Sequence, residues 1–597
     1  MASVPERAEL PTEYTWDLEA IYESDEEWEA AFDRVEDLIE EIQDFEGRLG
    51  DDGESLLAAL EERDELGREL EQLTSYARMR SDEDTRDQEY QALSARASSL
   101  ASEASSATAF FEPEIQALSQ DEVWAMIEAT EGLETYEHYL DDVMRAKPHT
   151  RSAEVEAVLS DLGEVLGAPN DIYGMLTNAD LTFPEVERED GTGVEITQSN
   201  FAVLLKDTDR EFRESVHEAF YEELGSVRNT VGASLKHQVK KAVKLAEIRG
   251  YDSARQAALD DPNIPVSVYD ALVETVHDNL DTLHRHAELK ADALGVDELA
   301  MWDLYAPMAE GESPEIEYEE ATDMVVEAMA PLGEDYQERV AEGLESRWVD
   351  VYENRGKRAG AYSGGTYDTH PYILMNWQED TSSLFTLAHE LGHSLHSELA
   401  HENQPYVYGS YEIFVAEVAS TVNESLLTDY LLRTVEDDRF RAHVLDEYLE
   451  RFRSTLFRQT MFAAFEQEIH ELSAAGEALT PDRLDEAYGD LKARYYEPAA
   501  VDEYIRTEWM RIPHFYYNFY VYQYATGISA AVAVVDRILS DGADAAEDYL
   551  DALRLGGSEY PLDVLETAGI DMTSPEPVET AMTEYSRRLD QMAEVLE

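Results

Sequence analysis

Apolar residues recur at every third or fourth position through most of the chain, with Glu, Asp and Arg between them. This spacing places the apolar side chains on one face of a helix, so it predicts a mainly α-helical protein. We interpret the acidic positions as solvated helix faces. The apolar repeat does not continue through enough heptads to predict a coiled coil. The expected helices cover residues 26–49, 54–80, 87–111, 152–166, 209–224, 267–294 and 440–472.

Three segments interrupt the helical pattern. Residues 181–196 contain two short alternating runs around a Gly-rich turn, which is typical of a β-hairpin. Residues 299–307 are short and aromatic, and residues 348–378 are rich in Gly and Tyr and predict a small sheet. We place a domain boundary after the hairpin, which gives an N-terminal helical domain (1–200) and a second domain (201–597) that carries the chemical motifs.

The composition limits what this protein can bind. The 597 residues include 132 Asp and Glu but only 45 Lys and Arg, so the formal net charge is −87. Nucleic acids and anionic membranes attract cationic proteins, so we exclude both as partners. No run of about 18 apolar residues predicts a membrane span, and residues 1–17 lack the cationic and apolar regions of a signal peptide. We therefore expect a cytoplasmic protein.

A net charge of −87 makes the surface repel itself in dilute salt. Hydrophobic residues still make up 43% of the chain and can form a large core, so the acidity does not predict disorder. At about 1 M salt the Debye length is only about 3 Å, and the repulsion is screened. We therefore expect a halophilic protein with a composition of the haloarchaeal type. A thermal unfolding midpoint that is equal in dilute buffer and in molar KCl would contradict this expectation.

The most specific motif is His389-Glu390-Leu391-Gly392-His393, in which two histidines are four residues apart. On a helix they share one face and can each direct a ring nitrogen to a common metal ion. Glu390 flanks that ion in the way that the general base of a zinc protease does. The chain contains no cysteine, so any metal ligands have to be His and carboxylate. A pair of surface histidines is disfavoured by the apolar and small residues on both sides.

A catalytic zinc site has three protein ligands and one open position, so a third ligand is expected. His396 lies about 10.5 Å along the helix axis from His389, too far to share one ion, and is interpreted as a supporting or structural residue. Glu417 is the better candidate, because it is the single ionisable residue in the apolar run 413–422 and a buried carboxylate needs a partner. The alternative is a Glu hydrogen-bonded to Arg or Tyr in the core. Glu424 either orients a ligand histidine or is an ordinary solvated Glu.

Residues 513–527 form a second informative segment, with five tyrosines and one histidine. Tyr517, Tyr520 and Tyr524 have helical spacing, so we expect them on one face of a helix. Phenolic O–H groups beside a metal ion can stabilise the negative oxygen that develops when a peptide bond is hydrolysed. A Tyr-rich packing helix explains the same pattern equally well.

At these residues the sequence resembles the oligoendopeptidase F group of the thimet oligopeptidase (M3) family of zinc peptidases. The resemblance implies a mostly helical, zincin-like metallopeptidase whose two parts close around a deep substrate channel, with a small β-sheet beside the active-site helix. It also implies one Zn²⁺ ion, a cytosolic location and endopeptidase cleavage of short unfolded oligopeptides. The matching segments span nearly the whole chain in the same order, at residues 16–22, 350–363, 371–376, 389–396, 417–420 and 514–527.

Residue by residue, the resemblance implies four roles at the metal site: His389, His393 and Glu417 as ligands and Glu390 as general base. It implies transition-state contacts from the aromatic segment, by His514, Tyr517 and Tyr524. The register of the tyrosines is open, and Tyr520 or Tyr522 can replace one of them. The segments 360–365 and 371–376 resemble the region that lines the family's substrate cleft, where strand-like pairing would suit sequence-tolerant peptide binding.

Two other functions are weighed against the endopeptidase. One is a metal-dependent carboxypeptidase on a similar helical frame, and the other is a non-catalytic helical peptide-binding protein with a disabled zinc site. The second is disfavoured because both histidines and both glutamates of the predicted site are present. The expected partners are short peptide substrates, and the oligomeric state is open, with a monomer slightly favoured.

Overall fold

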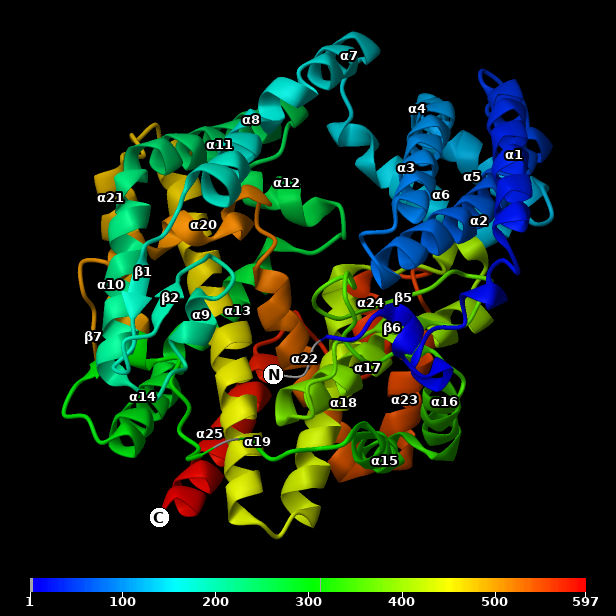
Figure 1. Ribbon diagram of the computed structural model, residues 1–597. Coiled ribbons are helices and arrows are strands. Elements are labelled where there is room, and N and C mark those ends of the chain that lie inside the picture. The colour runs from blue at the N-terminus through cyan, green and yellow to red at the C-terminus, as the bar shows by residue number, and fades with distance from the viewer. Residues whose placement is uncertain (1–3, 312) are drawn as a thin grey trace. The chain divides into compact units, whose positions relative to one another are not determined.

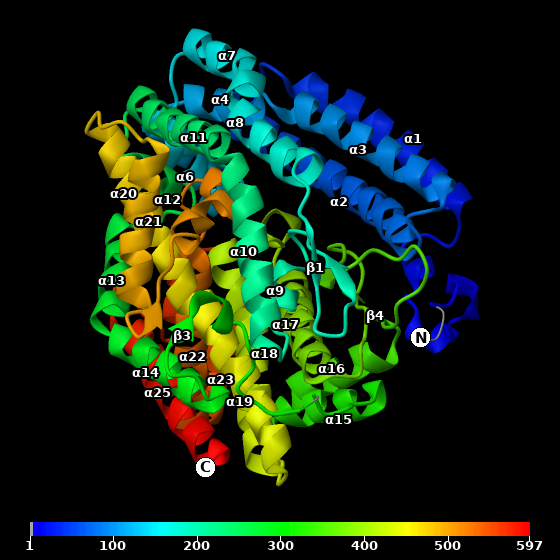
Figure 2. The same cartoon turned by 60° about the vertical axis from the view of Figure 1, so that its left-hand side comes forward.

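The structure is a computed structural model and describes residues 4–311 and 313–597. Helices dominate it, and within these residues the strands form three small sheets (Figures 1 and 2). The prediction of a mainly α-helical fold is confirmed. The chain divides into two compact units, neither of which is one continuous segment, while the boundary near residue 200 stays a prediction. Unit 1 comprises Met1–Pro148, Pro314–Leu431 and Val534–Gly569, and unit 2 comprises His149–Ser313, Leu432–Ala533 and Ile570–Glu597.

Unit 1 begins with three long helices that lie side by side in both views, α1 (Asp25–Ile42), α2 (Gly53–Glu83) and α3 (Gln88–Thr108) (Figures 1 and 2). They form because their apolar positions, such as Trp28 and Leu73, share one buried face. The other helices wholly within unit 1 are α4 (Phe111–Ala117), α5 (Gln120–Ala129), α6 (Glu137–Ala146), α15 (Tyr318–Ala328), α16 (Glu334–Glu345), α17 (Thr381–Asn403), α23 (Ala543–Arg554) and α24 (Pro561–Thr567).

A three-stranded sheet lies beside helix α17. Strand β4 (Val349–Asp350) is parallel to β6 (Tyr372–Leu374), and β5 (Tyr362–Gly364) is antiparallel to β6. Strands β5 and β6 pack against α17, which confirms the predicted small sheet beside this helix. The Asp380 side chain caps the start of α17 by accepting the backbone N–H of Ser383.

The backbones of α17 and α18 (Ile413–Thr434) approach very closely at Gly392. A Cβ atom at this position would lie 2.6 Å from the carbonyl oxygen of Ala419 and 2.6 Å from the Cα of Ser420. Glycine is therefore required sterically, because even a methyl group would overlap the backbone of α18. The close crossing brings the histidine-bearing face of α17 next to the face of α18 that carries Glu417.

Helix α11 (Arg228–Arg249) runs through unit 2 and packs against α8 (Gly163–Met175) and α20 (Gln459–Ala474). The predicted hairpin is present as β1 (Glu185–Glu187) and β2 (Gly193–Glu195), which pair antiparallel. Helix α22 begins in unit 2 and continues into unit 1. Two short strands, β3 and β7, pair in parallel, and the remaining helices complete the unit. They are α7 (Ala153–Asp161), α9 (Phe201–Leu204), α10 (Arg210–Ser226), α12 (Ala254–Asp260), α13 (Val266–Asp278), α14 (Leu280–Leu294), β3 (Leu299–Ala300), α19 (Asp438–Phe452), α21 (Pro481–Tyr495), β7 (Ala499–Ala500), α22 (Tyr522–Asp541) and α25 (Glu576–Leu596).

Some predicted helices are subdivided in the structure. The expected helix 267–294 is two helices, because Asn279 adopts a non-helical φ of −115° between α13 and α14. The expected helix 440–472 contains a π-helical segment at residues 453–458. Within the two described ranges, no helix combines the length and the apolar composition needed to cross a membrane.

Candidate metal centre and active site

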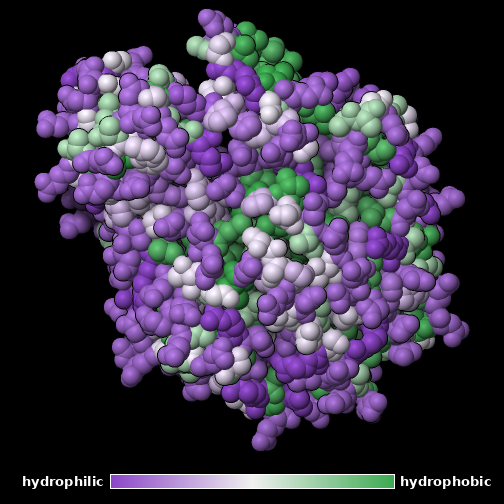
Figure 3. All heavy atoms as spheres, turned by 180° about the vertical axis from the view of Figure 1, so that it is seen from behind, coloured by the Kyte–Doolittle hydropathy of each residue, from purple (hydrophilic) through white to green (hydrophobic). Residues whose placement is uncertain are grey.

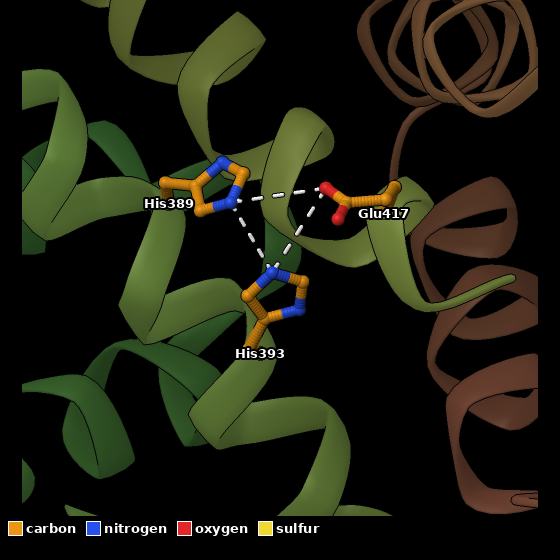
Figure 4. Close-up of side chains that lie close together, drawn as sticks. All are labelled: His389, His393 and Glu417. Atoms are coloured by element: carbon orange, nitrogen blue, oxygen red, sulfur yellow. Dashed lines mark hydrogen bonds and ion pairs between the residues drawn. The ribbon is translucent and has the colours of Figure 1, made fainter. Parts of the chain in front are cut away.

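Two histidines of α17 and one glutamate of α18 converge in unit 1 (Figure 4). The Nε2 atoms of His389 and His393 are 3.2 Å apart, and they lie 3.8 Å and 4.0 Å from Oε2 of Glu417. Tetrahedral ligands at about 2.0–2.1 Å from a zinc ion are ~3.3 Å from one another, so the two imidazoles already have ligand spacing. The structure thus brings together the three side chains that the sequence predicted as metal ligands.

Glu424 holds the ring of His389 from the side away from the metal cluster. Nδ1 of His389 donates to Oε1 of Glu424 at 2.6 Å, and the Glu424 residue is only 5% exposed. A hydrogen bond at Nδ1 places the lone pair on Nε2, which is the nitrogen that faces His393 and Glu417. The geometry therefore supports the interpretation that Glu424 orients a histidine. The alternative interpretation, that Glu424 is an ordinary solvated residue, is wrong.

His393 is neutral at physiological pH. Burial and the neighbouring His389 lower its pKa to about 3, and a hydrogen bond to the backbone of Ala416 only partly opposes this. A neutral imidazole has a free lone pair and can bind a metal ion without first losing a proton.

Glu390 is buried next to the metal cluster. Burial raises the pKa of its carboxyl group, and the charge of Glu417 acts in the same direction. His389 and the backbone N–H of Ser363 in strand β5 partly lower it. The hydroxyl groups of Ser363 and Ser394 are 2.8 Å apart and connect β5 to α17. The small sheet therefore fixes a carboxylate whose proton affinity is raised, as general-base chemistry near neutral pH requires.

His396 is a packing residue. Its side chain is fully buried and stacks on the ring of Tyr411, with 3.5 Å between the ring centroids. Burial lowers its pKa to about 3, so the ring is neutral. It does not belong to the metal cluster, in agreement with the helix-length argument from the sequence.

Tyr517, Tyr520 and Tyr524 do not lie on the one helix that their spacing predicted. A 3₁₀ turn covers Pro513–Tyr516, then Asn518 and Phe519 adopt positive φ angles of 48° and 55°, and α22 begins only at Tyr522. Two consecutive left-handed residues break a helix, so His514 and Tyr517 lie outside α22.

Four rings of this segment nevertheless form a cluster in unit 2. The ring centroid of His514 lies 5.8 Å from that of Tyr517, 6.3 Å from that of Tyr520 and 6.1 Å from that of Tyr524. Tyr522 is different, because it is only 1% exposed and packs against other core aromatic residues such as Tyr269. The geometry therefore leaves Tyr517, Tyr520 and Tyr524 as the tyrosines that accompany His514.

Two buried residues that sequence reasoning missed hold the loop that presents these rings. Gln238 of α11 donates to the carbonyl oxygen of Tyr516 at 2.7 Å, and the backbone N–H of Phe519 donates to Oε1 of Glu466 at 2.6 Å. Burial raises the pKa of Glu466 to about 8. Its sequence signal is weaker than that of Glu417, because Phe462, Ala463 and Ile469 lie one helical turn away but Glu468 follows two residues later.

The model of peptidase family M3 matches residues 203–584, and that of oligopeptidase F matches residues 114–183. The chain belongs to peptidase family M3. It is 46% identical to oligopeptidase PepF of Bacillus subtilis over 594 residues, which cover 99% of this chain and 89% of the relative. It is 40% identical over 593 residues to an oligoendopeptidase F homolog of Lactococcus lactis, with 99% and 98% of the two chains covered.

A solved structure of the same group agrees with the fold. The crystal structure of oligoendopeptidase-F from Enterococcus faecium superposes with a TM-score of 0.74 at 38% identity, covering 96% of this chain and 99% of the other. This M3 enzyme is thus a metalloendopeptidase of the oligoendopeptidase F type that hydrolyses oligopeptides. The carboxypeptidase and the non-catalytic binding protein are set aside.

Proposed function

We propose that this M3 enzyme hydrolyses internal bonds of short unfolded oligopeptides with one Zn²⁺ ion bound by His389, His393 and Glu417. The observation that carries the proposal is the convergence of two imidazole nitrogens and one carboxylate oxygen, all within 4.8 Å of one another. Two histidines and one glutamate are the ligand set of several catalytic zinc sites, in which the fourth position stays open for water or substrate. The hydrogen bond from His389 to Glu424 is the outer-shell support that such sites use.

Glu390 is proposed as the general base. When bound, zinc polarises the scissile carbonyl and lowers the pKa of water. Glu390 accepts a proton from the attacking water and returns it to the leaving amine. Its burial raises its pKa, which makes it a stronger proton acceptor than an exposed glutamate, while the Ser363 N–H keeps it in place.

His514, Tyr517 and Tyr524 are proposed to stabilise the oxyanion by donating hydrogen bonds. Their rings are clustered within unit 2, and Tyr517 is 52% exposed and therefore accessible to a substrate. Burial and the neighbouring Arg458 lower the pKa of His514. A neutral His514 still carries one N–H donor.

Strand β5 is proposed to bind the peptide backbone. It forms one edge of the sheet order β4–β6–β5, so one side of it has no strand neighbour in that sheet. A peptide added to this edge as an extra strand would be held by backbone hydrogen bonds, which tolerate many sequences. It would also run beside Ser363, the residue whose N–H contacts Glu390. The deep channel and the cytoplasmic, high-salt setting stay predictions.

An internally quenched peptide that is blocked at both ends tests this function in molar KCl. We expect cleavage of an internal bond, loss of that cleavage with a metal chelator, and recovery when Zn²⁺ is added back, because the three ligands need the ion. Mass spectrometry of the products and a series of peptide lengths measure the outcome. Cleavage that is limited to peptides with a free C-terminus, or that persists without metal, would contradict the proposal.

A further inference from the structure

Helix α11 in unit 2 concentrates positive charge in a very acidic protein. It carries four of the chain's nine lysines within nine residues, at positions 236, 240, 241 and 244. Lys244 pairs with Glu247, whereas no carboxylate of the described residues forms an ion pair with Lys236, Lys240 or Lys241. Lysines this close on one helix repel one another, so they are stabilised by anions from outside the helix.

Three lysines outside α11 form ion pairs with carboxylates. Lys290, Lys357 and Lys492 are buried and lie 3.4 Å, 2.6 Å and 2.7 Å from carboxylate oxygens. Lys147 and Lys206 also form no ion pair among the described residues, but they are far apart in the chain. Helix α11 instead carries three such lysines on adjacent turns, and this local excess of positive charge fits an anionic partner from outside the helix.

Three of these four lysines border an apolar groove between α8 and α11. Its volume is about 570 Å³, and its apolar wall includes Val165, Pro169 and Ile172. Lys240, Lys241 and Lys244 line it from α11, and no lining residue is a carboxylate. Val165 is 67% exposed and Ile172 is 51% exposed, so this wall is open to solvent. A site with an apolar wall and a cationic rim fits a ligand that carries both apolar and anionic side chains.

The apolar wall continues along α7. Val155 and Val158 of α7 and Leu162, which lies between α7 and α8, are all exposed, and their spacing of three and four residues continues to Val165 of α8. Figure 3 shows hydrophobic side chains gathered near the projecting α7 segment at the top of the view. An exposed apolar strip of this kind usually marks an interaction site.

We infer that the α8–α11 groove is a subsite for acidic stretches of the oligopeptide substrate, with carboxylates on the lysines and apolar side chains against α8. Asp and Glu make up more than one in five residues of this chain, 132 of 597. Fragments of proteins with such a composition carry several carboxylates even when they are short. The inference rests on the proposed function, because it names the peptides that the active site receives.

The groove is physically connected to the loop of the aromatic cluster. Gln238, which holds the carbonyl oxygen of Tyr516, precedes Lys241 by three residues and therefore lies about 4.5 Å from it along the axis of α11. On the other wall, Tyr173 of α8 stacks on Tyr516 with 4.5 Å between the ring centroids. A peptide in the groove would thus lie close to the loop that carries Tyr517.

A pair of quenched peptides tests the inference. Both have the same cleavage core, and one has Asp and Glu in its flanks where the other has Asn and Gln. The combined variant carries Lys240→Gln, Lys241→Gln and Lys244→Gln. We expect its ratio of kcat/KM for the acidic peptide to kcat/KM for the neutral peptide to be about fivefold lower than that of the parent enzyme. The change should be mainly in KM, and its size is that expected from the loss of three exposed ion pairs. In the parent enzyme the same ratio should decrease as KCl is raised.

A control variant of equal charge change is Arg285→Gln, Arg483→Gln, Arg587→Gln, whose three arginines are solvent-accessible elsewhere in unit 2. It should keep the parent's ratio. An unchanged ratio in the lysine variant overturns the inference. So does a dimer of the parent that dissociates in the lysine variant, or binding to anionic lipid vesicles that the variant loses, since either result assigns the groove to another occupant.

Binding without turnover separates this inference from the proposed function. Fluorescence anisotropy measures binding of the labelled acidic peptide to two proteins that both carry Glu390→Gln. One keeps the native lysines, and the other also carries the three lysine substitutions. Weaker binding in the lysine variant supports the subsite even if the base assignment fails, and equal binding overturns it even if the base assignment holds.

Discussion

Replacing Glu390 with Gln lowers oligopeptide turnover by about 10²- to 10⁴-fold while the zinc content stays that of the parent enzyme. Glutamine has nearly the same shape as glutamate but cannot accept the proton of the attacking water. The carboxylate is not part of the His389, His393 and Glu417 group, so its loss leaves the metal ligands in place. The measurement is kcat on a blocked quenched peptide, with metal content from mass spectrometry of the same sample.

The matched control is Glu417→Ala, which removes a proposed ligand instead of the base. We expect it to lose both zinc and activity, with a loss of metal affinity larger than the roughly 10- to 100-fold caused by removing an outer-shell partner. Parental turnover by zinc-loaded Glu390→Gln would refute the base assignment. An unchanged zinc stoichiometry in Glu417→Ala would move the third ligand to another residue.

Gly392→Ala damages the site although it adds only one methyl group. The new Cβ would lie 2.6 Å from two backbone atoms of α18, so α17 and α18 have to separate. Overpacking of this kind typically costs about 1–3 kcal/mol of the free energy of unfolding. Because His393 and Glu417 lie on opposite sides of the crossing, zinc affinity should fall with stability. Thermal unfolding and zinc titration in molar KCl measure the two effects.

Gly225→Ala is the matched control for this substitution. Gly225 lies within helix α10, and a Cβ atom there would meet nothing within 4 Å. Alanine favours a helix more than glycine by about 0.5–1 kcal/mol, so this variant should be as stable as the parent or slightly more stable. Equal stability and zinc affinity in the two variants would show that the α17–α18 crossing tolerates separation.

The metal ligands could be predicted because their signals are local. The positions of His389 and His393 on one helix face follow from helix geometry, and Glu417 is the single ionisable residue of the apolar run 413–422. Glu466 also has apolar neighbours one helical turn away, but it holds the aromatic loop instead of a metal ion. A buried carboxylate needs a partner, but its sequence neighbours do not say which partner it has.

The aromatic segment shows where local patterns fail. The spacing of Tyr517, Tyr520 and Tyr524 predicted one helix, yet the left-handed residues Asn518 and Phe519 interrupt it. Contacts from distant residues, above all Glu466 and Gln238, stabilise that conformation. Hydrogen bonds from other helices can offset a local backbone cost of this size, and periodicity does not detect them.

The sequence by itself determined the helical class, the acidic surface, the histidine pair and the single carboxylate of the apolar run 413–422, because each depends on residues within a few turns of one another. Only the tertiary structure decided that Gly392 lets two helices meet, that Glu424 orients His389 and that Ser363 contacts Glu390. It alone placed Lys240, Lys241 and Lys244 of α11 beside the apolar wall of α8. These features join residues far apart in the chain, and their energies come from packing and desolvation that no local pattern encodes.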